Sequence, residues 1–499
     1  MRLRELLSGL KCLSVRGDLD VEAGTVVCDS RKVVPGAVFV ALAGEKSDGH
    51  RFIEAAVEAG AACVVGTDAT AVAGVRGCAA VEVADGRGAL ACLAYRIHRE
   101  PGKRMKVVGV TGTNGKTTIT YLLQASLEAC GLPTGLLGTL EASFGGRRIV
   151  MKHTTPEAPD LFGWLGEMAD AGMKAAAIEV SSHGIALQRA DRLDLAVGIF
   201  TNLSPEHLDF HGTMEEYGRI KERMFTEMLA ASSTLAGAVV NADDPWGQRI
   251  AERLSYPCLR YAIGEGGEAE VRGENVRTAI EGTRFTATGP WGSVEVSTHL
   301  IGRHNVSNIL SVLAAAWLLG CDVKRAVRGI EAVKGVAGRL ERVENGLGIG
   351  VWVDYCHTPD SMEKVLLALR ESVPGRLIVV FGAGGDRDRK KRPLMGAMAE
   401  RFCQLSFCTS DNPRTERPLA ILEEVLSGMS ADYRFTSVAA IADRRLAIEA
   451  ALGVAQPGDG VLIGGKGAET YQIVGTQVHH FDDREVAREV LARRAEGAR

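Results

Sequence analysis

The chain has 499 residues, more than one hydrophobic core usually organises, which predicts about two to four domains. Its 58 lysines and arginines nearly balance 62 aspartates and glutamates, and this balance argues against a nucleic-acid-binding or membrane-surface protein. Hydrophobic residues make up 46% of the chain, enough for packed cores, which excludes general disorder.

The first residues, "MRLRELLSGLKCLSVRGD", interrupt their apolar positions with charge, which is typical of an amphipathic segment and not of a signal peptide. Stretches such as "SVLAAAWLLGC" are too short to span a bilayer. Eleven cysteines are scattered without a CxxC pair, which favours reduced thiols without structural zinc. We therefore expect a cytoplasmic monomer with no membrane or nucleic-acid partner.

Residues 1 to about 100 alternate short Val/Ala runs with helical stretches, as in "GAVFVALAG" and "HRFIEAAVEAGAACVVG". This pattern predicts a small α/β domain. The segment "HREPGKRMK" (98–106) that follows is polar and contains Pro and Gly, which predicts a linker.

The stretch "VVGVTGTNGKTT" (107–118) has a short apolar run before its glycines and an apolar helical pattern after them. Strand, glycine loop and helix form the context in which backbone N–H groups surround phosphate oxygens. The usual pattern has a glycine where this chain has Val110, and the alternative is a chance glycine turn. We expect Lys116 to bind the β- and γ-phosphates and Thr117 to ligate Mg²⁺. The predicted ATP-binding loop comprises Gly112, Thr113, Asn114, Gly115, Lys116, Thr117 and Thr118.

From this loop to about residue 335 strands and helices alternate, which predicts a mostly parallel sheet covered by helices. Glu179 ends one apolar strand, His207 follows another, and Lys221 lies on a predicted helix. A carboxylate and an imidazole beside a triphosphate fit divalent cation ligation. Taken singly, Glu179 has the alternative of a helix cap, His207 of a core histidine and Lys221 of a solvated face.

"AVKGVAGRLERV" (332–343) predicts a second junction, and four apolar strands with polar, glycine-containing ends follow it. In a doubly wound sheet such ends meet at one edge, where ligands bind. We therefore predict three α/β domains with boundaries at 1–100, 101–335 and 336–499.

Eight motifs occur in order across the chain: "GVTGTNGKTT", "TTPEA", "EVSSHGI", "TNLSPEHLDFHG", "GRHNVSNIL", "GRLERV", "VDYCHTPD" and "DNPR". Together they resemble the Mur ligases of peptidoglycan synthesis. The resemblance implies an N-terminal domain for a UDP-linked substrate, a central P-loop ATPase domain and a C-terminal Rossmann-like domain. It also implies an ATP-dependent ligase that phosphorylates the D-glutamate carboxylate of UDP-N-acetylmuramoyl-L-alanyl-D-glutamate and joins it to an amino acid.

The resemblance assigns roles to further positions. It implies that Glu179 and His207 bind metal, and that Lys221 is carbamylated and acts as a carboxylate near Mg²⁺. Leu187 stands where relatives often have glutamine, so one polar contact is missing or replaced. The implied ATP-closing residues are Asn305, Arg339 and Asp354. The implied contacts to the UDP-muramoyl dipeptide are Cys28, Ser30, Glu45, Lys46, Ser47, Thr154, Thr155, Ser181 and Arg189.

The resemblance also implies which amino acid is added. A guanidinium holds a carboxylate through two parallel hydrogen bonds, and lysine has no distal carboxylate to offer. Relatives that add meso-diaminopimelate have the DNPR pattern, so we expect that substrate, although a simple turn is the alternative. Most of "DRDRKKR" (386–392) is expected to be a solvated basic run. The implied diaminopimelate contacts are Arg387, Asp411, Asn412, Pro413, Arg414, Gly465 and Glu469.

Two substitutions depart from the pattern of relatives: Ala468 replaces a common histidine, and Cys356 replaces a common alanine. The first removes an imidazole near the amino-acid site, and we expect the second to be neutral. Rival interpretations are a ligase resembling folylpolyglutamate synthase or cyanophycin synthetase, a Mur ligase adding another residue, and a nucleotide-dependent switch. The N-terminal "CDSRKV" and the DNPR stretch argue against the first two, and the C-terminal strand-end cluster argues against a switch.

Overall fold

The computed structural model describes residues 1–44, 47–264 and 268–497. The chain divides into two compact units, which we call the first and second units. The first unit comprises Met1–Tyr261 with Ser311–Ala326, and the second comprises Ala262–Leu310 with Val327–Arg499. The predicted boundaries of three domains remain a prediction.

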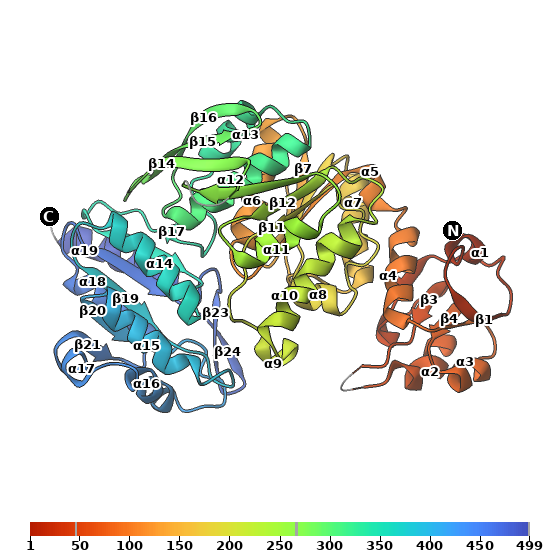
Figure 1. Ribbon diagram of the computed structural model, residues 1–499. Coiled ribbons are helices and arrows are strands. Elements are labelled where there is room, and N and C mark those ends of the chain that lie inside the picture. Colours follow the sequence, from red (N-terminus) through yellow and green to blue (C-terminus); the bar gives the residue numbers. More distant parts are fainter. Residues whose placement is uncertain (45–46, 265–267, 498–499) are drawn as a thin grey trace. The chain divides into compact units, whose positions relative to one another are not determined.

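The N-terminal part of the first unit, coloured red to orange in Figure 1, contains a five-stranded sheet. Its strand order is β1-β5-β4-β3-β2. All its neighbouring strands are parallel except β1 and β5. The strands are β1 (Cys12–Arg16), β2 (Thr25–Val27), β3 (Ala37–Val40), β4 (Cys63–Gly66) and β5 (Ala79–Val83). The helices are α1 (Leu3–Leu6), α2 (Ile53–Glu58), α3 (Ala69–Gly74) and α4 (Gly86–Ile97), with 3-10 turns at Ser30–Lys32 and Gly49–Phe52. The small α/β fold predicted for this region is confirmed.

The predicted linker after α4 contains one helical turn, α5 (Pro101–Arg104). Arg99 and Glu100 adopt positive φ angles of 59° and 49° just before it. Pro101 stands at the first helical position, where its fixed φ and missing N–H cost nothing.

The larger sheet of the first unit has the order β13-β12-β11-β6-β10-β7-β8-β9. Its strands are parallel from β13 to β7, as the sequence predicted, because each lies between helical crossovers. The antiparallel strands β8 and β9 were not predicted. The strands are β6 (Lys106–Thr111), β7 (Thr134–Leu137), β8 (Glu141–Phe144), β9 (Arg147–Val150), β10 (Ala175–Glu179), β11 (Val197–Phe200), β12 (Gly237–Asn241) and β13 (Cys258–Ile263).

Helices connect these strands. They are α6 (Lys116–Ala129), α7 (Ala158–Asp170), α8 (Ser182–Ala186), α9 (Leu208–His211), α10 (Met214–Arg223) and α11 (Pro245–Arg253), with a π-helical turn at Met224–Leu229. α12 (Arg303–Leu318) has residues in both units, and α13 (Val323–Glu331) follows it. The second unit begins with an antiparallel meander that the sequence did not predict: β14 (Val271–Ala279), β15 (Gly282–Gly289) and β16 (Gly292–Thr298).

The C-terminal sheet has the order β17-β18-β22-β19-β20-β21, and all its strands except β17 are parallel. Its faces bury separate apolar clusters, with Trp352 in one cluster and Val351 and Val353 in the other. The strands are β17 (Glu341–Arg342), β18 (Gly350–Asp354), β19 (Leu377–Phe381), β20 (Leu405–Cys408), β21 (Val438–Ala440) and β22 (Gly460–Gly464), with a separate hairpin of β23 (Tyr471–Val474) and β24 (Gln477–His480). This is the Rossmann-like arrangement predicted from four apolar strands.

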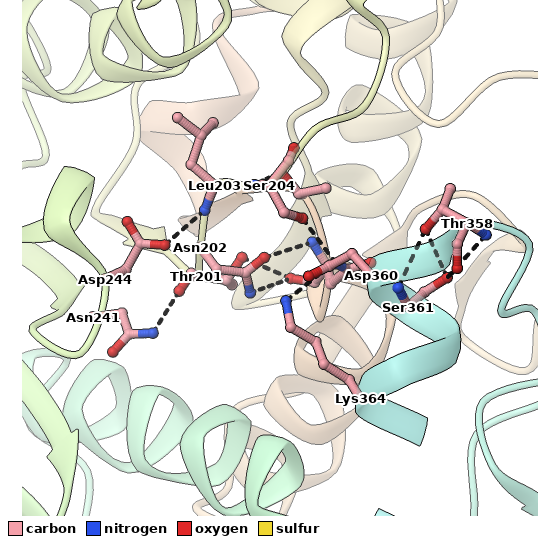
Figure 2. Close-up of polar contacts among 12 residues, drawn as sticks. Thr201, Asn202, Leu203, Ser204, Asn241, Asp244, Thr358, Asp360, Ser361 and Lys364 are labelled. Carbon is pink, nitrogen blue, oxygen red and sulfur yellow. Dashed lines mark hydrogen bonds and ion pairs between the residues drawn. The ribbon is translucent and has the colours of Figure 1, made fainter. Parts of the chain in front are cut away.

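The helices of this sheet are α14 (Pro359–Ser372), α15 (Lys391–Phe402), α16 (Pro418–Leu426), α17 (Ala431–Ser437), α18 (Arg444–Val454) and α19 (Asp483–Gly497). α14 begins with a capping box in which Thr358 and Ser361 satisfy each other's backbone N–H groups (Figure 2). Within the described parts of the chain, no helix is both long and apolar enough to cross a bilayer.

Candidate active site

The glycine loop joins the end of β6 to the first turn of α6, as the sequence predicted. Gly112 and Gly115 have φ angles of 140° and 92°, which side-chain-bearing residues rarely adopt. A Cβ on Gly112 would lie 1.9 Å from Thr201 Oγ1, so only glycine fits there. Val110, the departure from the usual pattern, lies within β6 and is fully buried. That position therefore belongs to the strand and needs no glycine.

The segment after β11 holds the loop in place. The Asn202 carbonyl accepts a hydrogen bond from Thr113 N at 2.8 Å, and Asn202 Oδ1 accepts one from Asn114 N at 3.0 Å. Thr201 Oγ1 donates to the Asn114 carbonyl at 2.7 Å. Figure 2 shows that Asn241 Nδ2 donates in turn to the Thr201 carbonyl, at 2.7 Å. The sequence identified this segment as a motif, but it did not predict that Thr201 and Asn202 would bind the glycine loop.

Two lysines meet the carbonyl oxygen at the start of the loop. Lys116 Nζ donates to the Gly112 carbonyl at 2.9 Å and to that of Thr113 at 2.8 Å. Lys221 Nζ, from α10, donates to the same Gly112 oxygen at 2.8 Å and lies 4.4 Å from the centre of the Tyr217 ring. Lys221 is only 1% exposed, so the alternative of a solvated face is wrong. Burial lowers the pKa of Lys221 well below its usual value, and nearby Lys116 lowers it further.

Glu179 ends β10 beside the loop and is almost fully buried. Its two carboxylate oxygens accept hydrogen bonds from Thr139 N at 2.9 Å and Thr139 Oγ1 at 3.0 Å. Thr139 Oγ1 also lies 3.0 Å from Thr154 Oγ1. Ser181, not Glu179, caps the following helix α8 by accepting from Gly184 N. The structure therefore excludes the helix-cap alternative for Glu179.

The residues predicted to contact the muramoyl dipeptide gather around Glu179. Thr155 Oγ1 donates to the Glu179 carbonyl at 2.9 Å and accepts from Ser181 N at 2.9 Å. Arg189 Nη1 donates to the Thr155 carbonyl at 3.1 Å, and its Nε donates to Glu157 Oε1 at 2.8 Å. Glu157 was not predicted, and it fixes the guanidinium of Arg189.

Leu187, the departure noted in the sequence, contributes its backbone here. Its carbonyl accepts from Arg87 Nη1 at 3.2 Å, and Arg87 also pairs with Glu157 at 3.6 Å. The adjacent Gln188, whose φ is 53°, donates through Nε2 to Asp85 Oδ2 at 3.1 Å. The polar contacts around this turn thus come from Gln188 and Arg87.

His207 has a φ of 56° and its side chain is 46% exposed, so it is not a core histidine. Its ring lies edge-on to His183, with centroids 4.8 Å apart, and His183 also contacts Phe210 and His211. Burial of the ring lowers the pKa of His207, and Lys116 and Lys221 lower it further, although Glu206 opposes them. A neutral imidazole is therefore favoured, which is the form that ligates metals. Sequence reasoning did not single out His183 or His211.

The predicted Mg²⁺ ligands lie after neighbouring strands: Thr117 after β6, Glu179 at the end of β10 and His207 after β11. The carboxyl ends of parallel strands meet at one edge of a sheet, and the sheet order places β10 and β11 on either side of β6. The described residues contain no group of three His, Cys, Asp or Glu side chains placed to hold a metal. The hydroxyl and carboxylate oxygens still fit Mg²⁺, and a carbamate on Lys221 would add oxygen ligands.

The residues predicted for the uridine end are only partly described. Ser30 begins a 3-10 turn whose cap, Asp29, accepts from Arg31 N at 3.0 Å. Burial raises the pKa of Cys28 to about 11, and Glu157 and Asp160 add to the rise. Cys28 thus lies near the Glu157 cluster, whereas Ser47 is exposed. Glu45 and Lys46 lie outside the described residues.

In the second unit, Asp354 ends β18 and joins two predicted groups of residues. Its carboxylate accepts from Leu340 N and Cys356 N, both at 2.7 Å, and its carbonyl accepts from Gly465 N at 3.0 Å. Burial raises the pKa of Asp354, although Arg339 opposes the rise. Tyr355 follows Asp354, and the centre of its ring lies 4.9 Å from the guanidinium carbon of Arg339. Arg339 and Asp354 therefore lie beside the segment predicted to bind the amino acid.

Asn305, the third predicted ATP-closing residue, makes local contacts in α12. Its Nδ2 donates to the Ile301 carbonyl at 2.9 Å, and its Oδ1 accepts from Asn308 Nδ2 at 3.1 Å. It is 4% exposed. These contacts stabilise the start of α12 and do not test its predicted role.

The DNPR segment follows β20 and is connected to the β22 loop. Asn412 Nδ2 donates to Glu469 Oε2 at 3.0 Å, and Asn412 Oδ1 accepts from Ile473 N at 2.9 Å. A Cβ on Gly465 would lie 2.7 Å from Asp411 Oδ2, so glycine permits this close approach. Arg414, with a φ of 51°, donates through Nη1 to the Gly385 carbonyl at 2.7 Å. Pro413 connects these residues within the same turn.

Arg387 and Arg414 both approach Gly384, where a Cβ would lie 3.6 Å from Arg387 Cγ and 3.0 Å from Arg414 Nη1. Arg387 is exposed, and its predicted contact with the amino acid remains a prediction. The expectation of a solvated run is wrong for Arg392, which is fully buried. Arg392 binds Glu416 at 2.8 Å and Glu424 at 2.8 Å, a pairing that a single sequence does not reveal.

Ala468 and Cys356, which differ from the residues common in relatives, both lie close to backbone atoms near this site. The Ala468 carbonyl accepts from Arg484 Nη2 at 3.4 Å, and a Cβ on Gly338 would lie 2.1 Å from Ala468 N. Cys356 is buried with its sulfur against Gly464, where a Cβ would lie 2.9 Å away. A small residue is therefore needed on at least one side of each contact.

Comparisons with known proteins agree with this geometry. Residues 23–95 match the description "Mur ligase family, catalytic domain", 110–316 match "Mur ligase middle domain", and 338–467 match "Mur ligase, glutamate ligase domain". The UDP-N-acetylmuramoyl-L-alanyl-D-glutamate–2,6-diaminopimelate ligase of Geobacter sulfurreducens is 43% identical over 98% of each chain. The UDP-N-acetylmuramyl-tripeptide synthetase of a Roseiflexus species is 42% identical over 99% of each chain.

A solved structure of a UDP-N-acetylmuramoyl-L-alanyl-D-glutamate–2,6-diaminopimelate ligase matches with a TM-score of 0.73 and 30% identity, covering 99% of each chain. The similarity thus extends over both units and over every predicted site segment. The chain belongs to the Mur ligase family.

Proposed function

We propose that this protein joins meso-2,6-diaminopimelate to the D-glutamate carboxylate of UDP-N-acetylmuramoyl-L-alanyl-D-glutamate, using ATP. Relatives with that printed name match at 36% to 43% identity over nearly the full chain. The product is a UDP-linked tripeptide, a precursor of peptidoglycan. We place the reaction in the cytoplasm, where ATP is available, and expect a monomer.

The proposed reaction has two chemical steps. An oxygen of the D-glutamate carboxylate attacks the γ-phosphorus of ATP, and ADP leaves with the electron pair of the broken P–O bond. The amine of diaminopimelate then attacks the carbonyl carbon of the acyl phosphate, loses a proton and expels inorganic phosphate. Phosphorylation is needed because a carboxylate would otherwise have to expel oxide.

Bringing a carboxylate to a triphosphate requires positive charge and hydrogen-bond donors. The loop from Gly112 to Gly115 offers backbone N–H groups at the start of α6, and Lys116 adds an ammonium. Lys116 donates to two backbone carbonyls of the loop, at 2.9 and 2.8 Å, and phosphate oxygens would replace these neutral acceptors. This arrangement supports ATP as the phosphoryl donor.

Glu179, His207 and Thr117 would hold Mg²⁺, which neutralises charge on the phosphates when bound. Lys221 would contribute as a carbamate, formed when its neutral amine adds CO₂ and releases a proton. The burial of Lys221 and the nearby Lys116 favour the neutral amine that this addition requires. The carbamate would also place an anion beside Lys116.

The muramoyl dipeptide would bind along the cluster that surrounds Glu179. Thr154 and Ser181 present hydroxyl groups there, and Arg189 is oriented by Glu157 at 2.8 Å. A guanidinium fixed in this way can bind a second carboxylate or an amide carbonyl of the dipeptide. Ser30 and Cys28 would contact the nucleotide end.

The choice of diaminopimelate depends on one observation: Arg387 and Arg414 approach Gly384 together at the carboxyl edge of the C-terminal sheet. The Arg414 guanidinium lies there, whereas Arg387 approaches Gly384 with its aliphatic Cγ. A guanidinium suits a distal carboxylate, which L-lysine lacks. Glu469 and Asp411 lie nearby and suit an ammonium group.

The test is a set of parallel incubations of the purified protein with ATP, Mg²⁺ and UDP-N-acetylmuramoyl-L-alanyl-D-glutamate. One receives meso-diaminopimelate, one L-lysine and one no amino acid, and phosphate release and product mass are followed. We expect release that requires both co-substrates and a mass gain of diaminopimelate only. A product with lysine alone would keep the ligase and discard this specificity. Phosphate release that does not depend on the muramoyl substrate would rule out the proposed ligase reaction.

A further inference from the structure

Lys466 lies at the centre of the predicted amino-acid site, although the sequence did not single it out. It follows Gly465 in the loop after β22, and its side chain is fully buried. A buried ammonium needs partners, because its transfer from water is costly. Lys466 is therefore held at this place for a structural or a chemical reason.

The partners of Lys466 are residues of the DNPR turn and of its own loop. Its Nζ lies 3.2 Å from Asn412 Oδ1, 3.3 Å from Glu469 Oε2 and 3.7 Å from Asp411 Oδ1. Its ammonium also lies 5.6 Å from the centre of the Tyr471 ring. One buried cation thus lies beside three of the residues that the resemblance to Mur ligases predicted to bind the amino acid.

Asn412 is largely occupied by these contacts. Its Oδ1 accepts from both Lys466 Nζ and Ile473 N, and its Nδ2 donates to Glu469 Oε2 at 3.0 Å. Only one Nδ2–H remains for a ligand. Asn412 and Lys466 together fix the carboxylate of Glu469, since both bind the same oxygen atom.

The charges of the cluster favour one kind of amino acid. Asp411 and Glu469 contribute two negative charges, and the buried Lys466 ammonium lies 3.7 Å from the first carboxylate and 3.3 Å from the second. Free diaminopimelate carries two carboxylates and two ammonium groups, but lysine carries one carboxylate and two ammonium groups. A buried cation that offsets these two carboxylates therefore disfavours the unbalanced ammonium of lysine.

We propose that Lys466 is a specificity-determining and positioning residue, which orients Glu469 and offsets the charges of Asp411 and Glu469 so that diaminopimelate is preferred over lysine. This inference rests on the proposed function and adds a residue and a charge rule to it. Without Lys466, Asp411 and Glu469 lose a shared counter-ion. The site then becomes more favourable for the extra positive charge of lysine.

The experiment measures selectivity directly. Each variant receives meso-diaminopimelate with L-lysine in excess. The two tripeptide products are distinguished by mass, and the ratio of their amounts is corrected for the substrate concentrations. A ratio of products does not depend on how much of the enzyme is folded, so a less stable variant remains informative. The KM values of diaminopimelate, ATP and the UDP-linked substrate are measured alongside.

The test variants are Lys466→Met, which keeps length without charge, and Lys466→Arg, which keeps the charge. The matched control is Arg376→Met, because Arg376 pairs with Asp459 at 2.6 Å and precedes β19, away from the carboxyl edge of the sheet. We expect Lys466→Met to lower the ratio about tenfold or more, corresponding to about 1.4 kcal/mol. Its diaminopimelate KM should rise, with the other two KM values unchanged.

Lys466→Arg should restore most of the selectivity, and Arg376→Met should keep the wild-type ratio. An unchanged ratio in Lys466→Met would overturn the inference, as would an equal rise in all three KM values. If neither Lys466→Met nor Lys466→Gln gave folded protein while Lys466→Arg did, the residue would be structural and the inference would fail. Absence of a diaminopimelate product from the wild-type protein would instead overturn the proposed function.

Discussion

Lys116 and Lys221 donate hydrogen bonds to the same oxygen atom, the carbonyl of Gly112, at 2.9 and 2.8 Å. They reach it from different helices, α6 and α10, and lie about 100 residues apart in the sequence. Two ammonium groups that share one acceptor repel each other, and one of them is fully buried. The arrangement is relieved if Lys221 becomes neutral or negatively charged, which links the phosphate loop to the chemistry of Lys221.

Replacing Lys221 with alanine should therefore abolish turnover, whereas Lys221→Glu should recover part of it. The glutamate restores a carboxylate in place of the expected carbamate, although on a shorter side chain. The measurement is phosphate release with all substrates present, together with the intact mass of the protein in bicarbonate buffer. Full activity of Lys221→Ala would contradict the carbamate assignment.

Gly112→Ala should inactivate the enzyme without unfolding it. The added Cβ would lie 1.9 Å from Thr201 Oγ1 and would occupy a φ of 140°, so the loop must shift. A displacement of about 1 Å at a phosphate site lowers turnover roughly a hundredfold. The assay is kcat at saturating ATP. The control is Gly74→Ala, since a Cβ there meets no atom within 4 Å. Equal activity of the two variants would refute the predicted strain.

The phosphate loop could be predicted from the sequence because all its parts are adjacent in the chain. Strand β6, the glycines and α6 follow one another within about two dozen residues, and local patterns specify each of them. The carboxyl ends of β18, β19, β20 and β22 were likewise found, because each apolar strand is followed by its polar residues. Parallel pairing then brings those ends to one edge.

The sequence did not reveal contacts that depend on tertiary placement. Glu157 orients Arg189 from 32 positions away, and Lys466 meets Asn412 across 54 positions. Arg392 looked like one member of a basic run, yet it is fully buried with two glutamates. Periodicity carries no information about such pairs, since the partners come from separate elements.

Arg414→Ala should lower kcat/KM for diaminopimelate by about thirtyfold or more, corresponding to at least about 2 kcal/mol of lost charge pairing. The KM of ATP should stay near its wild-type value. Initial rates at varied diaminopimelate and ATP concentrations measure both effects. Arg434→Ala is the control, because Arg434 is an exposed arginine of α17 in the same unit. Unchanged diaminopimelate kinetics in Arg414→Ala would remove the specificity argument.

Glu179→Gln should raise the Mg²⁺ concentration needed for half-maximal activity by about tenfold or more, because a neutral amide is a weaker ligand for Mg²⁺ than a carboxylate. The amide oxygen can still accept from Thr139, so the local fold should survive. Activity is titrated with Mg²⁺ after treatment with a chelator. Glu167→Gln is the control, since Glu167 forms an exposed ion pair with Arg147. Identical titrations for both variants would exclude Glu179 as a metal ligand.

Arg444 and Arg445 offer a matched comparison of a buried and an exposed ion pair. Arg444 binds Asp483 with both side chains fully buried, whereas Arg445 binds Glu489 with side chains 44% and 55% exposed. Arg444 also donates to the carbonyls of Ser410 and Gly464, immediately before the two loops of the amino-acid site. Both guanidiniums hold α19 against α18, but Arg444 is buried and makes two further hydrogen bonds to backbone carbonyls.

Arg444→Met should cost about 3–5 kcal/mol because it leaves Asp483 charged and buried, whereas Arg445→Met should cost at most about 1 kcal/mol. The thermal midpoint of the transition that unfolds the second unit should fall by roughly 10 °C in the first variant and by a few degrees at most in the second. Calorimetry resolves such transitions. The double variant Arg444→Met/Asp483→Leu should regain part of the loss, because no unpaired charge remains. Equal midpoints for Arg444→Met and Arg445→Met would show that the buried pair does not stabilise this unit.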